Sequence, residues 1–366
     1  MVDFRKAFAE KLNEFVIPST TPQEDKSSMI KELDDLVLHN LPSSLYKYRS
    51  CNIRNIEALS RHVTYGVPVS YMNDPMDGLV YIDKNKIIAD AKFGLSRGFV
   101  EFVKSTKCLP SSMDIYLDDD KRESILNAIL NSSEEDIATI ITQNQQSEEE
   151  LIAFIDKFID DKIKELRDVS LISSFSETQY DNSMWAYYAD NHSGFVIEYE
   201  PKSTRFDFCY NCSRYNPEKC KQQAVRGLLY PIIYQNERTD ATMWLDAKLG
   251  ELILKSTGLS DKVYNPDILF YDRICLTKDE KWAHEKEWRV VCYPERQSEV
   301  GKPIEMTTPT PKAIYYGVNI LPENLSMLRS VVQALSSISP TPIKEYQMKI
   351  NNFAKGFELT TELLQQ

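Results

Sequence analysis

The sequence is poor in glycine, with 11 glycines against 17 prolines in 366 residues. Loops that cradle phosphates with backbone N–H groups need several glycines at fixed spacing. Neither the G-x-G-x-x-G pattern nor the G-x-x-x-x-G-K-[S/T] pattern occurs. A glycine-rich nucleotide site of either familiar type is therefore not expected.

The chain also lacks a long apolar run, an excess of positive charge and an even number of cysteines. No stretch approaches the roughly 20 apolar residues that a membrane-spanning helix needs. The first residues do not have the basic-then-apolar layout of a signal peptide, and the seven cysteines are most simply reduced thiols. We therefore expect a cytoplasmic protein that does not contact a membrane.

Acidic residues outnumber basic ones, 55 against 43, which gives a net charge of −12. Such a surface repels phosphate backbones, so broad non-specific binding to nucleic acid is disfavoured, although a local basic groove stays open. Hydrophobic residues make up 42% and charged residues 27% of the chain. These values are typical of a folded globular protein and exclude a disordered or collagen-like chain.

The length allows one large domain or two smaller ones. Residues 1–40 are predicted to form an N-terminal helical segment, and 41–366 a catalytic α+β domain. Within it, 83–168 is rich in helix-favouring and acidic residues, which predicts a helical insertion with solvated charged faces. Residues 200–226 are predicted to form a cysteine-bearing loop.

The remaining pattern favours a sheet core with added helices. Short β-favouring runs predict strands at 45–48, 67–71, 169–175, 195–199, 230–234, 287–293, 313–316 and 344–350. Helical spacing predicts helices at 3–16, 52–61, 182–188, 240–256, 266–280 and 322–337. Asn182 or Ser183 is expected to cap the short helix that ends at Tyr188, and 17–28 is expected to be a polar, proline-bearing stretch.

The first motif with chemical potential is Tyr48-Arg49, at the end of the first predicted strand. An arginine there can form two parallel hydrogen bonds to a phosphate. The structural alternative is a surface arginine beside packed tyrosines.

A second motif combines Ser174 and Ser176 with Trp185 and Tyr188. Serines at a strand end can hold sugar hydroxyls, and the two aromatic rings can stack on a flat ring. Helix capping by a serine and core packing by the aromatic residues are the alternatives.

The third motif is Glu285-Lys286-Glu287-Trp288-Arg289. In an extended chain Glu285, Glu287 and Arg289 share one face, and Trp288 faces the core. Carboxylates alternating on one sheet face repel each other, which suggests a site rather than simple packing. An exposed edge with a Glu287–Arg289 pair is the alternative.

Two further groups of residues are candidates for a site, and for both of them a structural role is the favoured interpretation. In the turn Asn73-Asp74-Pro75-Met76-Asp77, Asn73, Asp74 and Asp77 are candidates for the wall of a substrate pocket, and a proline turn with a local hydrogen bond is the alternative. Cys209, Cys212 and Cys220 are too few for a four-ligand zinc site unless His192 or Cys275 completes it. Unpaired thiols in a loop are the favoured interpretation, and no metal is expected.

Together and in this order, these motifs resemble a bacterial group known as domain of unknown function 2971. The resemblance rests on Lys47-Tyr48-Arg49, the Asn73–Asp77 turn, Ser174-Phe175-Ser176 with Met184-Trp185 and Tyr188, the Glu285–Arg289 motif and residues 311–317. It spans about 45–317 and is interrupted by the helical insertion and the cysteine-bearing loop.

The succession of arginine, Ser-x-Ser and Glu-x-Glu also resembles the layout of ADP-ribosyltransferases, with a split mixed β-sheet core. That resemblance implies that Arg49 holds the phosphate and ribose of NAD, that Ser174 and Ser176 support the nicotinamide ribose, and that Glu287 stabilises the transition state. Glu285 is then expected to activate or orient the acceptor. The usual central threonine is missing from Ser-Phe-Ser, and the insertion separates Arg49 from the serines.

Aromatic chemistry adds Trp185 and Tyr188 as walls for the nicotinamide, with Tyr48 beside Arg49 and Arg289 on the substrate side. The expected function is that of a NAD-consuming ADP-ribosyltransferase, a toxin-like effector of bacterial anti-phage defence with a protein or nucleic-acid acceptor. One alternative is a metal-dependent nuclease in which Asp74, Asp77, Glu285 and Glu287 hold Mg²⁺. Another is a non-catalytic module whose acidic insertion docks a regulatory protein partner.

Overall fold

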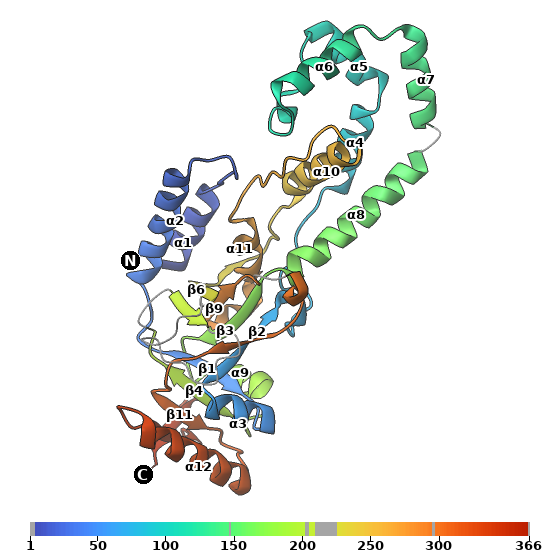
Figure 1. Ribbon diagram of the computed structural model, residues 1–366. Helices are drawn as coiled ribbons and strands as arrows, with labels where there is room; N and C mark the ends of the chain where they lie inside the picture. The colour runs from blue at the N-terminus through green and yellow to red at the C-terminus, as the bar shows by residue number, and fades with distance from the viewer. Residues whose placement is uncertain (1–3, 146–147, 202–204, 209–224, 295–296, 365–366) are drawn as a thin grey trace.

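The computed structural model describes residues 4–145, 148–201, 205–208, 225–294 and 297–364 (Figure 1). It is an α+β protein with a mixed, largely antiparallel sheet, which confirms the predicted class. Cys209, Cys212 and Cys220 lie outside the described residues, so the zinc hypothesis stays a hypothesis.

The elements follow one another along the chain with the helices of the insertion grouped in the first half. The helices are α1 (Phe4–Glu14), α2 (Gln23–Leu38), α3 (Ile53–Ser60), η1 (Val69–Tyr71), α4 (Lys84–Gly94), α5 (Arg97–Thr106), η2 (Ser111–Met113), α6 (Asp119–Leu130), α7 (Glu134–Gln145), α8 (Glu148–Asp168), α9 (Asn182–Tyr188), α10 (Thr242–Ser256), α11 (Phe270–Cys275), η3 (Glu280–Glu285), η4 (Gln297–Glu299) and α12 (Pro322–Ile338). The strands are β1 (Leu45–Arg49), β2 (Val63–Pro68), β3 (Leu171–Ser176), β4 (Phe195–Tyr199), β5 (Arg205–Phe208), β6 (Val225–Pro231), β7 (Ile233–Gln235), β8 (Thr277–Asp279), β9 (Glu287–Cys292), β10 (Ile304–Thr307), β11 (Ala313–Tyr316), β12 (Lys344–Ile350) and β13 (Leu359–Leu363).

The main sheet has the order β13-β12-β11-β4-β1-β3-β9-β6-β5, and β2 branches from β3 to pair with β10. Only β11 and β12 run parallel within it; the other neighbours are antiparallel. A separate parallel pair is formed by β7 and β8. The segments 47–49, 174–176 and 287–289 therefore lie on the adjacent central strands β1, β3 and β9, although they are far apart in sequence.

The sheet opens between β1 and β3. Strand β1 pairs with β4 along its whole length, and β3 pairs with β9 from Leu171 to Ser176. In contrast, β1 and β3 share the single pair Tyr46↔Ser176. Strand β2 pairs with β3 at Ile172 instead, so the two halves of the sheet diverge from one point.

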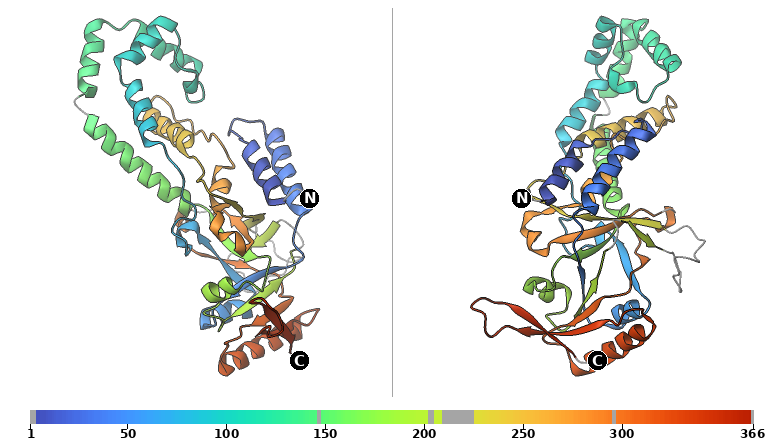
Figure 2. Two further views of the ribbon diagram at one scale, coloured as in Figure 1. Left: turned by 180° about the vertical axis from the view of Figure 1, so that it is seen from behind. Right: turned by 90° about the vertical axis from the view of Figure 1, so that its left-hand side faces the viewer.

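The first two helices form a hairpin that packs beside the strands β6 and β9 (Figure 2). Phe4 stacks on Trp288 and Phe8 stacks on Tyr230. The prediction that the polar stretch extends over 17–28 is wrong in its second half, because the helix α2 already begins at Gln23. Two acidic residues in the first turn of α2 suit the helix dipole, and its buried side chains pack in the main core.

The segment 83–168, predicted to be a helical insertion, contains the helices α4 to α8, which project away from the sheet in both figures. It is not independent of the rest of the chain, because α10 packs on α4 and α8. Ile87 and Ile155 of the insertion share one apolar cluster with Trp244 and Leu245 of α10. The insertion and α10 thus form one helical unit around a core of their own.

Most predicted strands are confirmed, and several local predictions are wrong. The strand expected at 67–71 begins earlier, at Val63, and turns into η1. The helix expected at 266–280 is only α11, because β8 follows it and pairs with β7. Strands β5, β10 and β13 were not anticipated, and the loop expected at 200–226 is wrong in part, because β5 and the first residues of β6 lie within it. Asp181, rather than Asn182 or Ser183, caps α9 by accepting a hydrogen bond from Met184 N–H.

The turn after α9 brings its backbone against the end of β1. Asp190, Asn191 and His192 all have positive φ, and Gly194 then donates its N–H to Ala189. A Cβ on Gly194 would lie 2.1 Å from the carbonyl oxygen of Arg49. Glycine is needed here because two backbones approach closely beside the motif arginine.

Gly194→Ala is expected to destabilise the protein by about 1–3 kcal/mol, since backbone atoms and not a flexible side chain meet the new methyl group. Urea unfolding measures this. Gly94→Ala is the matched control, because a Cβ at Gly94 meets nothing within 4 Å. Equal stability of the two variants would contradict the close approach.

Candidate active site

A cavity of about 200 Å³ lies where β1 and β3 diverge. Its walls come from five separate parts of the chain: β1, β2 with the turn after it, β3, α9, and the segment from β8 to β9. The lining residues are Tyr46, Lys47, Tyr48, Arg49, Tyr65, Val67, Met72, Ile172, Ser173, Ser174, Phe175, Met184, Tyr188, Lys278, Glu285 and Glu287. Tyr48, Arg49, Ser174, Tyr188, Glu285 and Glu287, singled out from the sequence, therefore meet at one cavity.

One wall of the cavity carries two cations from β1. Lys47 donates from Nζ to Ser173 Oγ (2.8 Å) and to the carbonyl oxygen of Ser174 (2.7 Å), and it lies over the Phe175 ring. Arg49 donates from Nη2 to Thr64 Oγ1 (2.8 Å). Among the described residues neither cation forms an ion pair.

Burial acts on both of these groups. It lowers the pKa of Lys47 well below its usual value, the charge of Arg49 adds to this effect, and Glu287 opposes it. Burial also lowers the pKa of Arg49. A buried cation without a carboxylate partner is costly, so this wall is complementary to an anionic group of a ligand.

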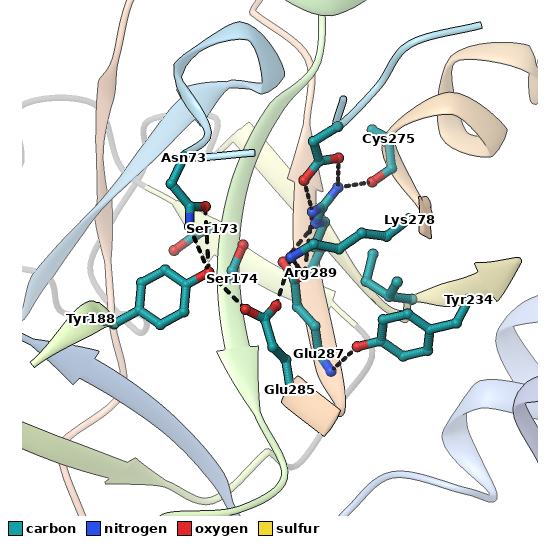
Figure 3. A network of polar contacts seen from close by, with 12 residues as sticks. Asn73, Ser173, Ser174, Tyr188, Tyr234, Cys275, Lys278, Glu285, Glu287 and Arg289 are labelled. Carbon is teal, nitrogen blue, oxygen red and sulfur yellow. Dashed lines mark hydrogen bonds and ion pairs between the residues drawn. The ribbon is translucent and has the colours of Figure 1, made fainter. Parts of the chain in front are cut away.

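A second part of the lining is an acidic network around Lys278 (Figure 3). Lys278 Nζ lies 2.6 Å from Glu285 Oε2 and 3.0 Å from Glu287 Oε2. Tyr188 donates its hydroxyl to Glu285 Oε1 (2.7 Å). All four groups line the cavity, and both carboxylates are buried.

Behind Glu287 lies a fully buried arginine. Arg289 donates from Nε to Glu287 Oε1 (2.7 Å) and forms a two-pronged ion pair with Asp77 (3.0 and 2.5 Å). Its Nη1 also donates to the carbonyl oxygen of Cys275 (2.5 Å). Asp77 and Arg289 therefore support the site from behind and do not line the cavity.

The network contains three carboxylates, Asp77, Glu285 and Glu287, and two cations, Lys278 and Arg289. Burial alone would raise the pKa of Glu287, but the charges of Arg289 and Lys278 lower it to about 2. Burial also raises the pKa of Tyr188, and Glu285 raises it further. The network thus contains one more carboxylate than it has cations.

Glu285 and Glu287 are brought together by a backbone conformation that differs from the predicted extended strand. Glu285 ends the 3₁₀ helix η3, and only Glu287 lies in β9, so the expected shared strand face is wrong. Lys286 between them has φ 45°, a left-handed conformation that turns the chain sharply. Lys278 then draws the two carboxylates together.

The two motif serines have different surroundings. Ser174 lines the cavity, whereas Ser176 is fully buried and donates to the carbonyl oxygen of Glu285 (2.7 Å). Ser176 thereby fixes η3 against β3. Of the two serines, only Ser174 is in place to meet a ligand.

The two aromatic candidates differ in the same way. Tyr188 lines the cavity, but Trp185 is fully buried, donates to the carbonyl oxygen of Gln179 (2.7 Å) and packs edge-on against Tyr48. Trp185 supports Tyr48 from behind and is not a cavity wall. Core packing, the alternative given for this residue, describes its position.

The three candidate residues of the Asn73–Asp77 turn make three different kinds of contact. Asn73 donates to the Tyr188 hydroxyl (3.0 Å), which is near the cavity. Asp74 accepts from Met76 N–H (2.8 Å), a local turn contact. Asp77 pairs with Arg289, as described above. Among the described residues no group of three or more His, Cys, Asp or Glu is arranged to hold a metal ion.

Lys47 and Lys278 were not identified as site residues from the sequence. In β1, Lys47 lies between the packed tyrosines Tyr46 and Tyr48. It is two residues from Arg49, and this spacing indicates that Lys47 and Arg49 share one face of the strand. Lys278 lies in a segment expected to be helical, so no local pattern pointed to it. Its role depends on the pairing of β8 with β7, which is a long-range contact.

Comparison with known proteins supports one of the two resemblances. Residues 184–290 match the family described as Protein of unknown function (DUF2971), so this segment of the chain is similar to that family. The match includes Tyr188, Lys278, Glu285, Glu287 and Arg289. No curated protein and no solved structure gives a significant match. The resemblance to ADP-ribosyltransferases is not shown by these comparisons and stays a hypothesis.

Within the described residues, none of the helices combines the length and hydrophobicity needed to cross a bilayer.

The low pKa of Glu287 predicts a specific loss of stability in acid. Its folded-state pKa of about 2 lies below the ordinary 4.5, so its contribution is complete above pH 4.5 and is lost as the pH falls towards 2. The shift corresponds to about 3 kcal/mol. Urea unfolding of wild type and Glu287→Gln between pH 7 and pH 2.5 measures it. Convergence of the two stability curves in acid is expected, and parallel curves would contradict the assignment.

Proposed function

We propose that this protein is a NAD-consuming ADP-ribosyltransferase that uses the cavity between β1 and β3. The observation that carries the proposal is the polarity of the cavity. It is lined by Lys47 and Arg49, which form no ion pair among the described residues, and by Glu285 and Glu287 of the acidic network. NAD has matching polarity, with a pyrophosphate at its centre and a ribose that becomes positive during reaction.

The reaction breaks the bond between ribose C1′ and the nicotinamide nitrogen. The bonding electron pair leaves with nicotinamide, which becomes neutral, and positive charge develops on C1′ and the ring oxygen. An acceptor oxygen or nitrogen then bonds to C1′ and loses its proton. Fixed negative charge in a site shielded from water stabilises such a transition state.

Glu287 suits this electrostatic role better than proton transfer. A carboxylate with a pKa of about 2 is ionised at neutral pH and is a weak base. Glu287 lines the cavity, so its carboxylate lies beside the space that a bound ribose would occupy. Glu285, which Tyr188 and Lys278 orient, is our candidate for aligning the acceptor.

The size of the cavity limits how NAD can bind. Its volume of about 200 Å³ is below the range of about 300–1,000 Å³ that holds drug-sized ligands. It suits one nicotinamide-ribose unit, with the pyrophosphate at Arg49 and the adenosine outside. The further role as a toxin-like effector of bacterial anti-phage defence, acting on a protein or nucleic-acid acceptor, rests on the family resemblance.

Arg49→Lys is expected to weaken NAD binding about tenfold to hundredfold, since hydrogen bonds to charged groups contribute about 1.5–3 kcal/mol and lysine lacks the guanidinium fork. Calorimetry with purified protein measures the affinity. Arg61→Ala is the control, because Arg61 forms a surface ion pair with Glu305. Unchanged affinity in Arg49→Lys, or no binding by wild type at millimolar NAD, would remove the proposed site.

Glu287→Gln should keep NAD affinity and lower the rate of nicotinamide release about 10²–10³-fold, by analogy with loss of an oxyanion donor. Chromatography of released nicotinamide provides the rate. The matched control is Glu362→Gln, which alters an exposed glutamate of β13 paired with Lys349. A folded Glu287→Gln variant with full activity would exclude Glu287 as the stabilising carboxylate.

A further inference from the structure

The main chain of Glu287 is held from both sides. Its N–H donates to the hydroxyl of Tyr234 (2.7 Å). Its carbonyl oxygen accepts from the N–H of Ile232 (3.0 Å) and from Nη1 of Arg5 (2.9 Å). Arg5 belongs to α1, so a helix at the far end of the sequence contacts the backbone of the candidate catalytic residue.

Arg5 does more than cap one carbonyl group. The same Nη1 reaches the carbonyl oxygen of Ile232 (2.9 Å), and Nη2 pairs with Glu177 Oε1 at 2.6 Å. Glu177 Oε1 also accepts from the indole N–H of Trp288 (2.6 Å). The guanidinium therefore ties the start of β9 to the residue that follows β3.

The rings around Arg5 complete this arrangement. Its guanidinium carbon lies 5.7 Å from the ring centre of Tyr234 and 5.8 Å from that of Trp288, within reach of cation–π attraction. Tyr234 holds the N–H of Glu287, and Trp288 is the next residue in β9. The groups that fix the Glu287 peptide thus all contact one side chain.

Packing of α1 does not by itself require this cluster. Phe4 and Phe8 already dock the helix through stacking on Trp288 and Tyr230. The side chain of Arg5 is mostly buried, with 18% exposed. Ordering such a long side chain costs conformational entropy, and its hydrogen bonds are directed at the start of β9.

We propose that Arg5 is a positioning residue that orients Glu287 from behind the sheet, so that α1 is part of the machinery of the proposed reaction. The inference rests on the proposed function. Arg5 does not line the cavity and does not touch the substrate; it sets the direction in which the Glu287 side chain leaves the backbone. Displacement of a catalytic group by 1 Å can cost about 10²-fold in rate.

The test compares full-length wild type with Arg5→Lys and Glu177→Gln. Lysine keeps the positive charge but cannot reach three acceptors with fork geometry. Glutamine keeps an acceptor for Trp288 and removes the charge that orients Arg5. Lys6→Ala is the matched control on the same helix, because Lys6 is exposed and its nearest carboxylate, Glu10, is 4.0 Å away.

Two readouts are measured: kcat and KM for nicotinamide release, and amide hydrogen exchange of peptides covering 286–290. For Arg5→Lys and Glu177→Gln we expect kcat to fall about tenfold to hundredfold, KM to stay within about twofold, and exchange at 286–290 to speed up. Lys6→Ala should match wild type in both readouts.

A fall in stability alone, with unchanged kcat per folded molecule, would overturn the positioning role. So would unchanged exchange at 286–290 in Arg5→Lys. If wild type releases no nicotinamide, the proposed function fails by itself, and the exchange data still decide whether Arg5 orders the Glu287 backbone.

Discussion

The buried ion pair between Arg289 and Asp77 is the interaction on which the site depends. It joins β9 to the turn that follows β2, and the same guanidinium holds Glu287 and the carbonyl oxygen of Cys275. Because both partners are fully shielded from water, removal of Arg289 would leave the Asp77 carboxylate buried without its cation, which costs about 3–5 kcal/mol. The conformations of the turn, of α11 and of the acidic wall are therefore coupled through one side chain.

A second constraint is the opening of the sheet. Lys47 occupies the space in which β1 and β3 would otherwise pair, and it donates to Ser173 and to the carbonyl oxygen of Ser174. The bond to Ser174 gives a partner to a buried backbone carbonyl group where β1 and β3 do not pair. The opening is thus stabilised by specific hydrogen bonds. It creates one small cavity that is lined both by basic side chains and by acidic ones.

The sequence was informative where local pattern decides the outcome. The motifs on β1, β3 and β9 located Tyr48, Arg49, Ser174 and Glu287, which line the cavity, since the period of a strand determines which side chains share a face. The sequence could not separate Tyr188 from Trp185, because the two rings differ only in what packs around them. Lys278 and the left-handed turn at Lys286 were missed because both depend on contacts made far along the chain.

The position of the insertion explains how so long a segment leaves the site intact. Its last residues return to the point where it began: Arg167 donates to the carbonyl oxygen of Pro75 (3.3 Å), and Ser70 donates to Asp168 (2.5 Å). Val80 and Leu166 share one apolar cluster. The segment that contains α4 to α8 therefore begins and ends at neighbouring points, between β2 and β3. The entropic cost of lengthening such a connection grows only slowly. The Asp77 turn and the Ser174 strand can then keep their places at the cavity whatever the helical unit beyond them binds.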